Sequence, residues 1–136
     1  MRQLTEQDRL AVIDFVTRLK RLFSSELYSV VLYGSKARGE ATPDSDIDLL
    51  VILDARSRRN RIQVNKVASR VSLDFDVLLL PHVVSLEQWQ EMADTPFFFF
   101  REVFRDGWPV YGRPSVFAPL VRKDMPPLYE VTAVIA

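Results

Sequence analysis

The stretch that decides the fold lies between residues 30 and 53, and it consists of VVLYGSKARGE (30–40), ATPDS (41–45) and DIDLLVIL (46–53). Two apolar runs flank a corner of small residues and a turn, which predicts a strand, a loop and a second strand. At the corner, Gly34 lets another group come close to the backbone. A helical turn that starts at Ser35 would aim free N–H groups outward, and such groups bind phosphate well.

The second apolar run begins with two carboxylates one position apart, Asp46 and Asp48. Alternate residues of a strand share a face, so we expect both carboxylates on one face, with Cα atoms roughly 6.5 to 7 Å apart. Carboxylates that close repel each other unless a cation lies between them. Oxygen ligands beside a phosphate site favour Mg²⁺, and the pair therefore predicts a metal site.

The spacing of these residues resembles the signature of the DNA polymerase β-like nucleotidyltransferase superfamily. Gly34-Ser35, ten intervening residues and then Asp46-Ile47-Asp48 match that signature without a gap. The chain is most similar to the small stand-alone branch of the superfamily, the antitoxin-like minimal nucleotidyltransferases (MNT). The resemblance implies an α/β (α+β) nucleotidyltransferase fold, in which helices flank a small mixed β-sheet.

The resemblance also implies the reaction, which is transfer of a nucleoside monophosphate, AMP from ATP in the first place, to an acceptor hydroxyl with release of pyrophosphate. It implies that Asp46 and Asp48 hold two Mg²⁺ ions. A third carboxylate, Asp76, would bind the second ion or take the proton. In the nucleotide site, Gly34 and Ser35 would hold the β and γ phosphates. Positive charge for the leaving pyrophosphate would come from Lys36 or Arg38, of which Arg38 is assigned to the site.

Apolar residues at helical spacing predict a first helix from Glu6 to Phe23, with Thr5 and Asp8 as a capping arrangement. The first strand is expected over Ser29–Tyr33 and the second over Asp46–Leu53. If the corner and the two aspartates form one site, these two strands are antiparallel.

A third strand is expected over Ser72–Leu80, because Asp74, Asp76, Leu78 and Leu80 alternate on one face. A helix between the second and third strands would make that pair parallel. Asp76 is preferred to Asp74 as the third carboxylate, because an apolar run follows it as in the resembled family. The other carboxylate is then solvated or paired with an arginine.

Between the second and third predicted strands lies a basic run, Asp54–Arg61, which contains four arginines. It is a solvated loop, or else a contact for the triphosphate, for an acidic partner or for nucleic acid. The net charge of the chain, 18 basic against 18 acidic side chains, does not itself indicate nucleic acid.

Two further helices are expected, one that begins at Ser85-Leu86 and one that opens at Thr95-Pro96 and ends at Asp106-Gly107. A short strand is expected over Trp108–Gly112. The resulting nucleotidyltransferase domain covers residues 1–114, and residues 115–136 form a proline-rich arm that is extended or disordered.

The sequence lacks cysteine, an apolar signal region and an apolar run of about 20 residues, so a cytoplasmic protein without a membrane span is expected. The resemblance implies that the chain is the antitoxin of a HEPN/MNT toxin–antitoxin pair and modifies its HEPN-like partner. Two alternatives stay open. One is a non-catalytic antitoxin that binds and occludes its partner, and the other is a transferase for a small molecule such as an aminoglycoside.

Overall fold

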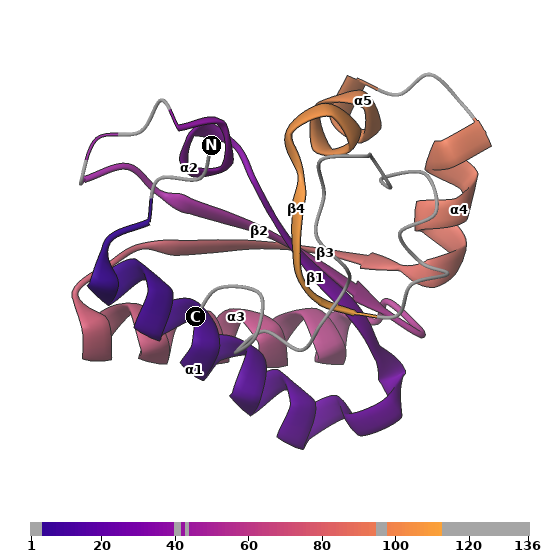
Figure 1. Cartoon of the computed structure of the whole chain (residues 1–136). Helices are drawn as coiled ribbons and strands as arrows, with labels where there is room; N and C mark the ends of the chain where they lie inside the picture. The colour runs from indigo at the N-terminus through magenta and orange to yellow at the C-terminus, as the bar shows by residue number, and fades with distance from the viewer. Residues whose placement is uncertain (1–3, 40–41, 43, 95–97, 113–136) are drawn as a thin grey trace.

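A four-stranded sheet with strand order β3-β2-β1-β4 forms the centre of the structure, a computed structural model that describes residues 4–39, 42, 44–94 and 98–112 (Figure 1). The elements, in chain order, are α1 (Glu6–Phe23), a 3-10 turn (Ser24–Glu26), β1 (Leu27–Tyr33), α2 (Ser35–Arg38), β2 (Ile47–Leu53), α3 (Arg58–Phe75), β3 (Leu79–Ser85), α4 (Leu86–Asp94), α5 (Phe98–Asp106) and β4 (Trp108–Gly112). Helices cover both faces of the sheet, so the expected fold class is confirmed.

The strands β1 and β2 are antiparallel, as the sequence predicts, with Tyr33 opposite Asp48 and Val31 opposite Leu50. On its other side β1 pairs antiparallel with β4, at the edge of the sheet. This register brings the end of β1 and its following corner beside the start of β2.

The helices α1 and α3 cover one face of the sheet (Figure 1). Helix α1 has the predicted bounds and the predicted cap, in which Thr5 and Asp8 exchange two hydrogen bonds of 3.0 Å. Its buried stripe includes Val12, Phe15 and Leu19, which are fully inaccessible and belong to the larger of two apolar cores. Burial of this stripe, rather than helix propensity alone, stabilises a helix of this length.

The opposite face of the sheet packs against α4 and α5. A second apolar core lies there, and it includes Val31, Leu50, Trp89 and Val103. Helix α4 begins with the expected cap, because Ser85 Oγ accepts from the Gln88 amide at 3.0 Å and the Gln88 side chain accepts from the Ser85 amide at 2.9 Å. The expected opening of the next helix at residues 95–97 lies outside the described residues, and so does the arm at 115–136.

The third strand was wrongly predicted over Ser72–Leu80. Helical spacing continues through the buried Val71 to Phe75, so α3 takes the first part of that segment, and β3 begins only at Leu79 and ends at Ser85. Asp76 follows the last residue of α3 and has a left-handed backbone conformation, φ +53°. Neither a helix nor a strand can continue through a residue in that conformation. The parallel pairing of β2 with β3 is nevertheless confirmed, with Ile47 opposite Leu79.

Pro81 lies inside β3. A proline is tolerated there because β3 is an edge strand, which needs no ladder hydrogen bond on its outer side.

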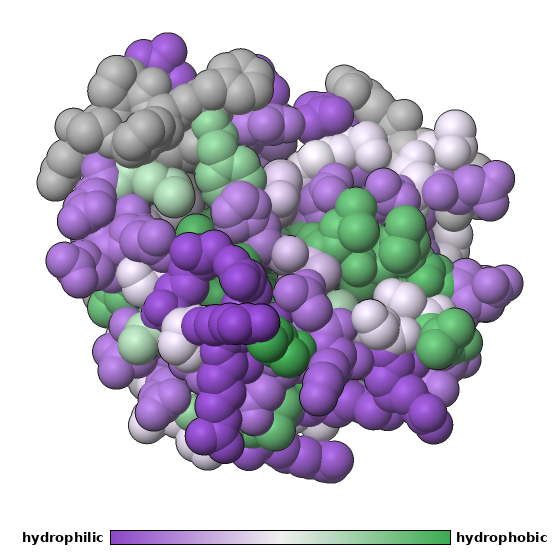
Figure 2. Space-filling view, turned by 180° about the vertical axis from the view of Figure 1, so that it is seen from behind, coloured by the Kyte–Doolittle hydropathy of each residue, from purple (hydrophilic) through white to green (hydrophobic). Residues whose placement is uncertain are grey.

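Figure 2 shows the face opposite to the view of Figure 1. Most of this face is hydrophilic, and it carries a hydrophobic patch. Within the described part of the chain, no helix is both long enough and apolar enough to cross a membrane.

Candidate active site

The corner after β1 is built so closely against Asp48 that only glycine fits. Gly34 has φ +78°, a backbone conformation that side chains with a Cβ rarely adopt. A Cβ placed on Gly34 would also lie 2.2 Å from Asp48 Oδ2, far inside van der Waals contact. The structure therefore brings Gly34 and Asp48 together, as the sequence analysis expected.

Ser35 begins α2, a four-residue helix, and is half-buried. The Gly34 carbonyl accepts hydrogen bonds from the amides of Ala37 and Arg38, at 3.1 and 3.2 Å, and these bonds close the turn. The corner is thus a tight, backbone-bonded turn beside the carboxylate of Asp48.

Lys36 does not face the site. Its Nζ lies 2.6 Å from Asp8 Oδ2, and its side chain is only 1% exposed. The same carboxylate oxygen accepts from the Thr5 amide in the cap of α1. Lys36 thus joins α2 to α1 inside the protein, and of the two cations considered for the pyrophosphate only Arg38 is accessible.

Arg38 lies on the other side of α2 and keeps 27% of its side chain exposed. Its Nη1 lies 3.5 Å from Asp106 Oδ2 and 3.7 Å from Glu102 Oε1, both on α5. Hydrogen bonds from Arg105 and then from Arg38 lower the pKa of Asp106.

Burial raises the pKa of Asp48 above its ordinary value, and the negative charges of Asp46 and Glu102 raise it further, while Arg38 opposes them. Burial, followed by the charges of Asp48 and Glu102, raises the pKa of Tyr33 to about 12. The surroundings of Asp48 therefore disfavour its charged form, and a bound cation relieves that condition.

The donor set fits Mg²⁺ only if substrate completes it. Within the described residues, no three acidic, histidine or cysteine side chains are grouped so that they could hold a metal by themselves. Mg²⁺ is commonly bound through one or two carboxylates together with phosphate oxygens and water, and Asp46 and Asp48 match that arrangement.

A family model described as "Nucleotidyltransferase domain" matches residues 12–97, which include the corner, both aspartates, β2 and β3. The chain belongs to the nucleotidyltransferase domain family.

Relatives and solved structures agree with this assignment. A Methanocaldococcus jannaschii protein named "Putative protein adenylyltransferase MJ0141" is 30% identical over 53% of this chain and 78% of its own length. A toxin–antitoxin crystal structure with AMP-PNP has a TM-score of 0.54 at 19% identity, over 79% of this chain and 80% of that one. The structure of a spectinomycin adenyltransferase, AAD(9) from Enterococcus faecialis with ATP and spectinomycin, has a TM-score of 0.56 at 13% identity. The match covers 84% of this chain and 59% of that one. The two structural likenesses show the nucleotidyltransferase fold.

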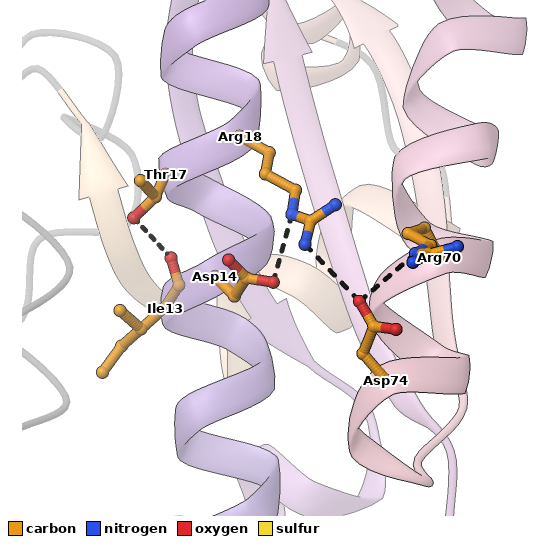
Figure 3. A network of polar contacts seen from close by, with 6 residues as sticks. All are labelled: Ile13, Asp14, Thr17, Arg18, Arg70 and Asp74. Carbon is orange, nitrogen blue, oxygen red and sulfur yellow. Dashed lines mark hydrogen bonds and ion pairs between the residues drawn. The ribbon is translucent and has the colours of Figure 1, made fainter.

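Neither candidate for the third carboxylate lies on β3 of this nucleotidyltransferase domain. Asp74 is on α3, where its Oδ2 lies 3.5 Å from Arg18 Nη2 and 3.4 Å from Arg70 Nε, so it joins α1 to α3 (Figure 3). Asp76 is exposed at the end of α3, and its role stays a prediction. The residue of β3 paired with Asp48 is apolar, Leu80, and is 40% exposed.

An aromatic group beside the site was not predicted from the sequence. The Phe99 ring meets the Tyr33 ring edge-on at 5.4 Å between centroids and stacks on the His82 ring at 4.6 Å. These residues come from α5, β1 and β3. The sequence has four phenylalanines in a row at 97–100, but the partners of Phe99 depend on the sheet register, which the sequence does not reveal.

The basic run is at the opposite end of β2 from the carboxylates, because Asp46 precedes the strand and Arg56 follows it. Seven residues of strand separate them by about 20 Å. A cavity of about 190 Å³ beside the middle of β3 is lined by Arg56, Arg61, Asn65, Pro81, His82 and Val83. The basic run thus begins a strand's length from the carboxylates. Burial lowers the pKa of His82, and Arg56 is near enough for its charge to lower it further.

Proposed function

We propose that this nucleotidyltransferase domain transfers AMP from ATP to a hydroxyl group of a partner protein and releases pyrophosphate. The observation that carries the proposal is the contact of Gly34 with Asp48, which places a backbone turn suited to phosphate against a carboxylate suited to Mg²⁺. Phosphoryl transfer depends mainly on positioning and on stabilisation of charge, and both requirements can be met at this corner.

In this proposal each residue has one task. Gly34 and Ser35 bind the β and γ phosphates, and Arg38 stabilises the charge of the leaving pyrophosphate. Asp46 and Asp48 would hold Mg²⁺, two ions in the complete complex. The bound metal would supply neutralisation of charge on the triphosphate and a lower pKa of the acceptor hydroxyl. Asp76 stays the sequence-based choice for a third carboxylate.

A protein acceptor is favoured by the name of the M. jannaschii relative, which describes a protein adenylyltransferase. The toxin–antitoxin complex with AMP-PNP, a structural neighbour, supports both ATP as the substrate and a toxin-like partner. We therefore propose that the chain is the antitoxin of a HEPN/MNT pair and modifies its toxin.

Labelled transfer tests the proposal. The purified protein is incubated with Mg²⁺, ATP labelled at the α-phosphate and a lysate of its source cells, beside the variant Asp46→Asn/Asp48→Asn. The matched control Asp14→Asn/Asp54→Asn also removes two carboxylates, one from α1 and one from the far end of β2. We expect a labelled protein band from the unmutated protein and from the control, but not from Asp46→Asn/Asp48→Asn. If the proposal is wrong, neither the unmutated protein nor the control gives a band.

A second candidate function is neutralisation of the partner by binding alone. One observation favours it: neither Asp74 nor Asp76 lies on β3 beside the two aspartates, where the sequence-based prediction placed a third carboxylate. If the variant Asp46→Asn/Asp48→Asn still neutralises the partner fully, binding rather than transfer accounts for neutralisation. Transfer to an aminoglycoside would instead be detected as turnover without any protein partner.

A further inference from the structure

Helix α5 carries an acidic residue, Glu102, on the side that faces the candidate site. Phe99, three residues before Glu102, contacts Tyr33, which is the β1 partner of Asp48. Residues three apart lie on the same side of a helix, so Glu102 is on the side of α5 that faces the site. Val103, which is fully buried in the core beneath, fixes the helix against the sheet.

Arg38 fixes the position of Glu102 further. The two side chains approach to 3.7 Å, and each is a little over a quarter exposed. They are therefore accessible to substrate while being held by α2 and α5. The negative charge of Glu102 acts on both Asp48 and Tyr33, which places it within electrostatic reach of the carboxylate pair.

We infer that Glu102, and not Asp76, is the carboxylate that receives the proton of the acceptor hydroxyl. This inference rests on the proposed function. Asp76 lies before β3 begins, in the turn that ends α3. The β3 residue opposite Asp48 is Leu80. Leu80 cannot act as a base, and His82, the base-capable residue of β3, lies two residues further along the strand, opposite Leu50. We therefore place the acid of the facing helix, Glu102, in that role.

The step is balanced without any further reactant. The acceptor oxygen forms a bond to the α-phosphorus of ATP, and the bond from that phosphorus to the bridging oxygen of pyrophosphate breaks. The hydroxyl proton passes to the Glu102 carboxylate, and pyrophosphate leaves with the electron pair of the broken bond. A carboxylate positioned in this way typically contributes about 10²- to 10⁴-fold to the rate.

The test compares Glu102→Gln with Asp76→Asn and Asp106→Asn in the labelled transfer reaction, using the acceptor band of the lysate as the probe. Asp106→Asn removes the other α5 partner of Arg38 and so reports what loss of such an ion pair does. Glu87→Gln, an exposed glutamate on α4, is the control for removal of a distant charge.

We expect Glu102→Gln to lower kcat about 10²-fold or more with little change in the KM for ATP, and Glu102→Asp to recover part of that loss. The affinity for a non-hydrolysable ATP analogue, measured by calorimetry, should change less than threefold. Asp106→Asn should retain most of the kcat, and Asp76→Asn should lower it far less than Glu102→Gln does.

Two results would overturn the inference while leaving the proposed function in place. In the first, Asp76→Asn loses kcat and Glu102→Gln keeps it. In the second, Glu102→Gln and Asp106→Asn weaken transfer and analogue binding alike, which would mean that Glu102 only holds Arg38. Absence of a labelled band from the unmutated protein would instead refute the proposed function, and the inference with it.

Discussion

Two cations of one short helix, Lys36 and Arg38, have opposite surroundings. Lys36 points into the protein and meets Asp8 of α1 at 2.6 Å, with almost no exposure. Arg38 points toward the site and meets two acids of α5 at 3.5 and 3.7 Å, with about a quarter of its side chain exposed. The inner pair holds the corner to the fold, and the outer cation remains available to a substrate.

The difference shows why residue type and spacing did not separate these cations. Both stand beside Gly34 and Ser35 in the sequence, and both could reach a phosphate from there. Which one is buried depends on Asp8, 28 residues earlier in the chain, and on the packing of α1 against the sheet. An ion pair that excludes water is strongly coupled to folding, whereas an exposed pair contributes little.

The largest expected effect is on stability. Lys36→Met should lower the free energy of unfolding by about 3–5 kcal/mol, because it leaves the Asp8 carboxylate buried without its partner. Arg38→Met should cost less than about 1 kcal/mol, since its ion pairs are partly exposed. Urea unfolding followed by circular dichroism measures both. Equal losses in the two variants would contradict the contrast between them.

The next effect is on transfer. Arg38→Met should reduce AMP transfer roughly 10- to 100-fold, because a charge-assisted hydrogen bond to the leaving pyrophosphate contributes about 1.5–3 kcal/mol. The measurement is the initial rate of label transfer at saturating acceptor. Arg70→Met, which removes an exposed ion pair with Asp74 on α3, is the matched control and should keep the full rate.

A smaller effect is expected from repairing the inner pair. The double variant Asp8→Asn/Lys36→Met should be more stable than Lys36→Met by about 1–3 kcal/mol, because it no longer buries an unpaired charge. Asparagine keeps an oxygen that can accept from the Thr5 amide, so the cap of α1 is retained. If the two substitutions are additive in urea unfolding, the ion pair is not coupled as its geometry indicates.

The smallest expected effect involves His82. Burial, and then the charge of Arg56, lower the pKa of His82 below its ordinary value of 6.5. The unfolded chain therefore binds the proton more readily, so stability is fully present above about pH 6.5 and falls as the pH drops through the folded-state pKa. His82→Gln should flatten the profile of melting temperature between pH 7 and pH 5. An unchanged slope in that variant would assign the pH dependence to other groups.

Local patterns in the sequence were enough to predict the first helix, the antiparallel β1–β2 pair, the parallel crossover to β3 and the contact between the corner and Asp48. Each depends on residues close in the chain or on a connection rule. The position of the third strand was wrong because two patterns compete in residues 72–80. Alternating acids indicate a strand there, but the apolar stripe of α3 continues to Phe75 and stabilises the helix instead.

The rest of the candidate site depends on contacts between distant segments. Glu102 is about 55 residues from the aspartates, and only the packing of α5 on β1 brings it close. Its sequence neighbours, phenylalanines and arginines, indicate a helix but no role. In the same way, Phe99 meets Tyr33 and His82 only because β1 and β3 flank β2 and the register places both side chains on the face that α5 covers.

The central claim is that ATP binds at the acidic end of β2, against Gly34. Calorimetric titration of a non-hydrolysable ATP analogue with Mg²⁺ tests it most directly, with the unmutated protein beside Asp46→Asn/Asp48→Asn and Arg58→Met/Arg59→Met. We predict that the aspartate variant loses affinity by about 100-fold or more, while the arginine variant at the other end of the strand binds as the unmutated protein does. Loss of binding in the arginine variant, with full affinity in the aspartate variant, would contradict the account.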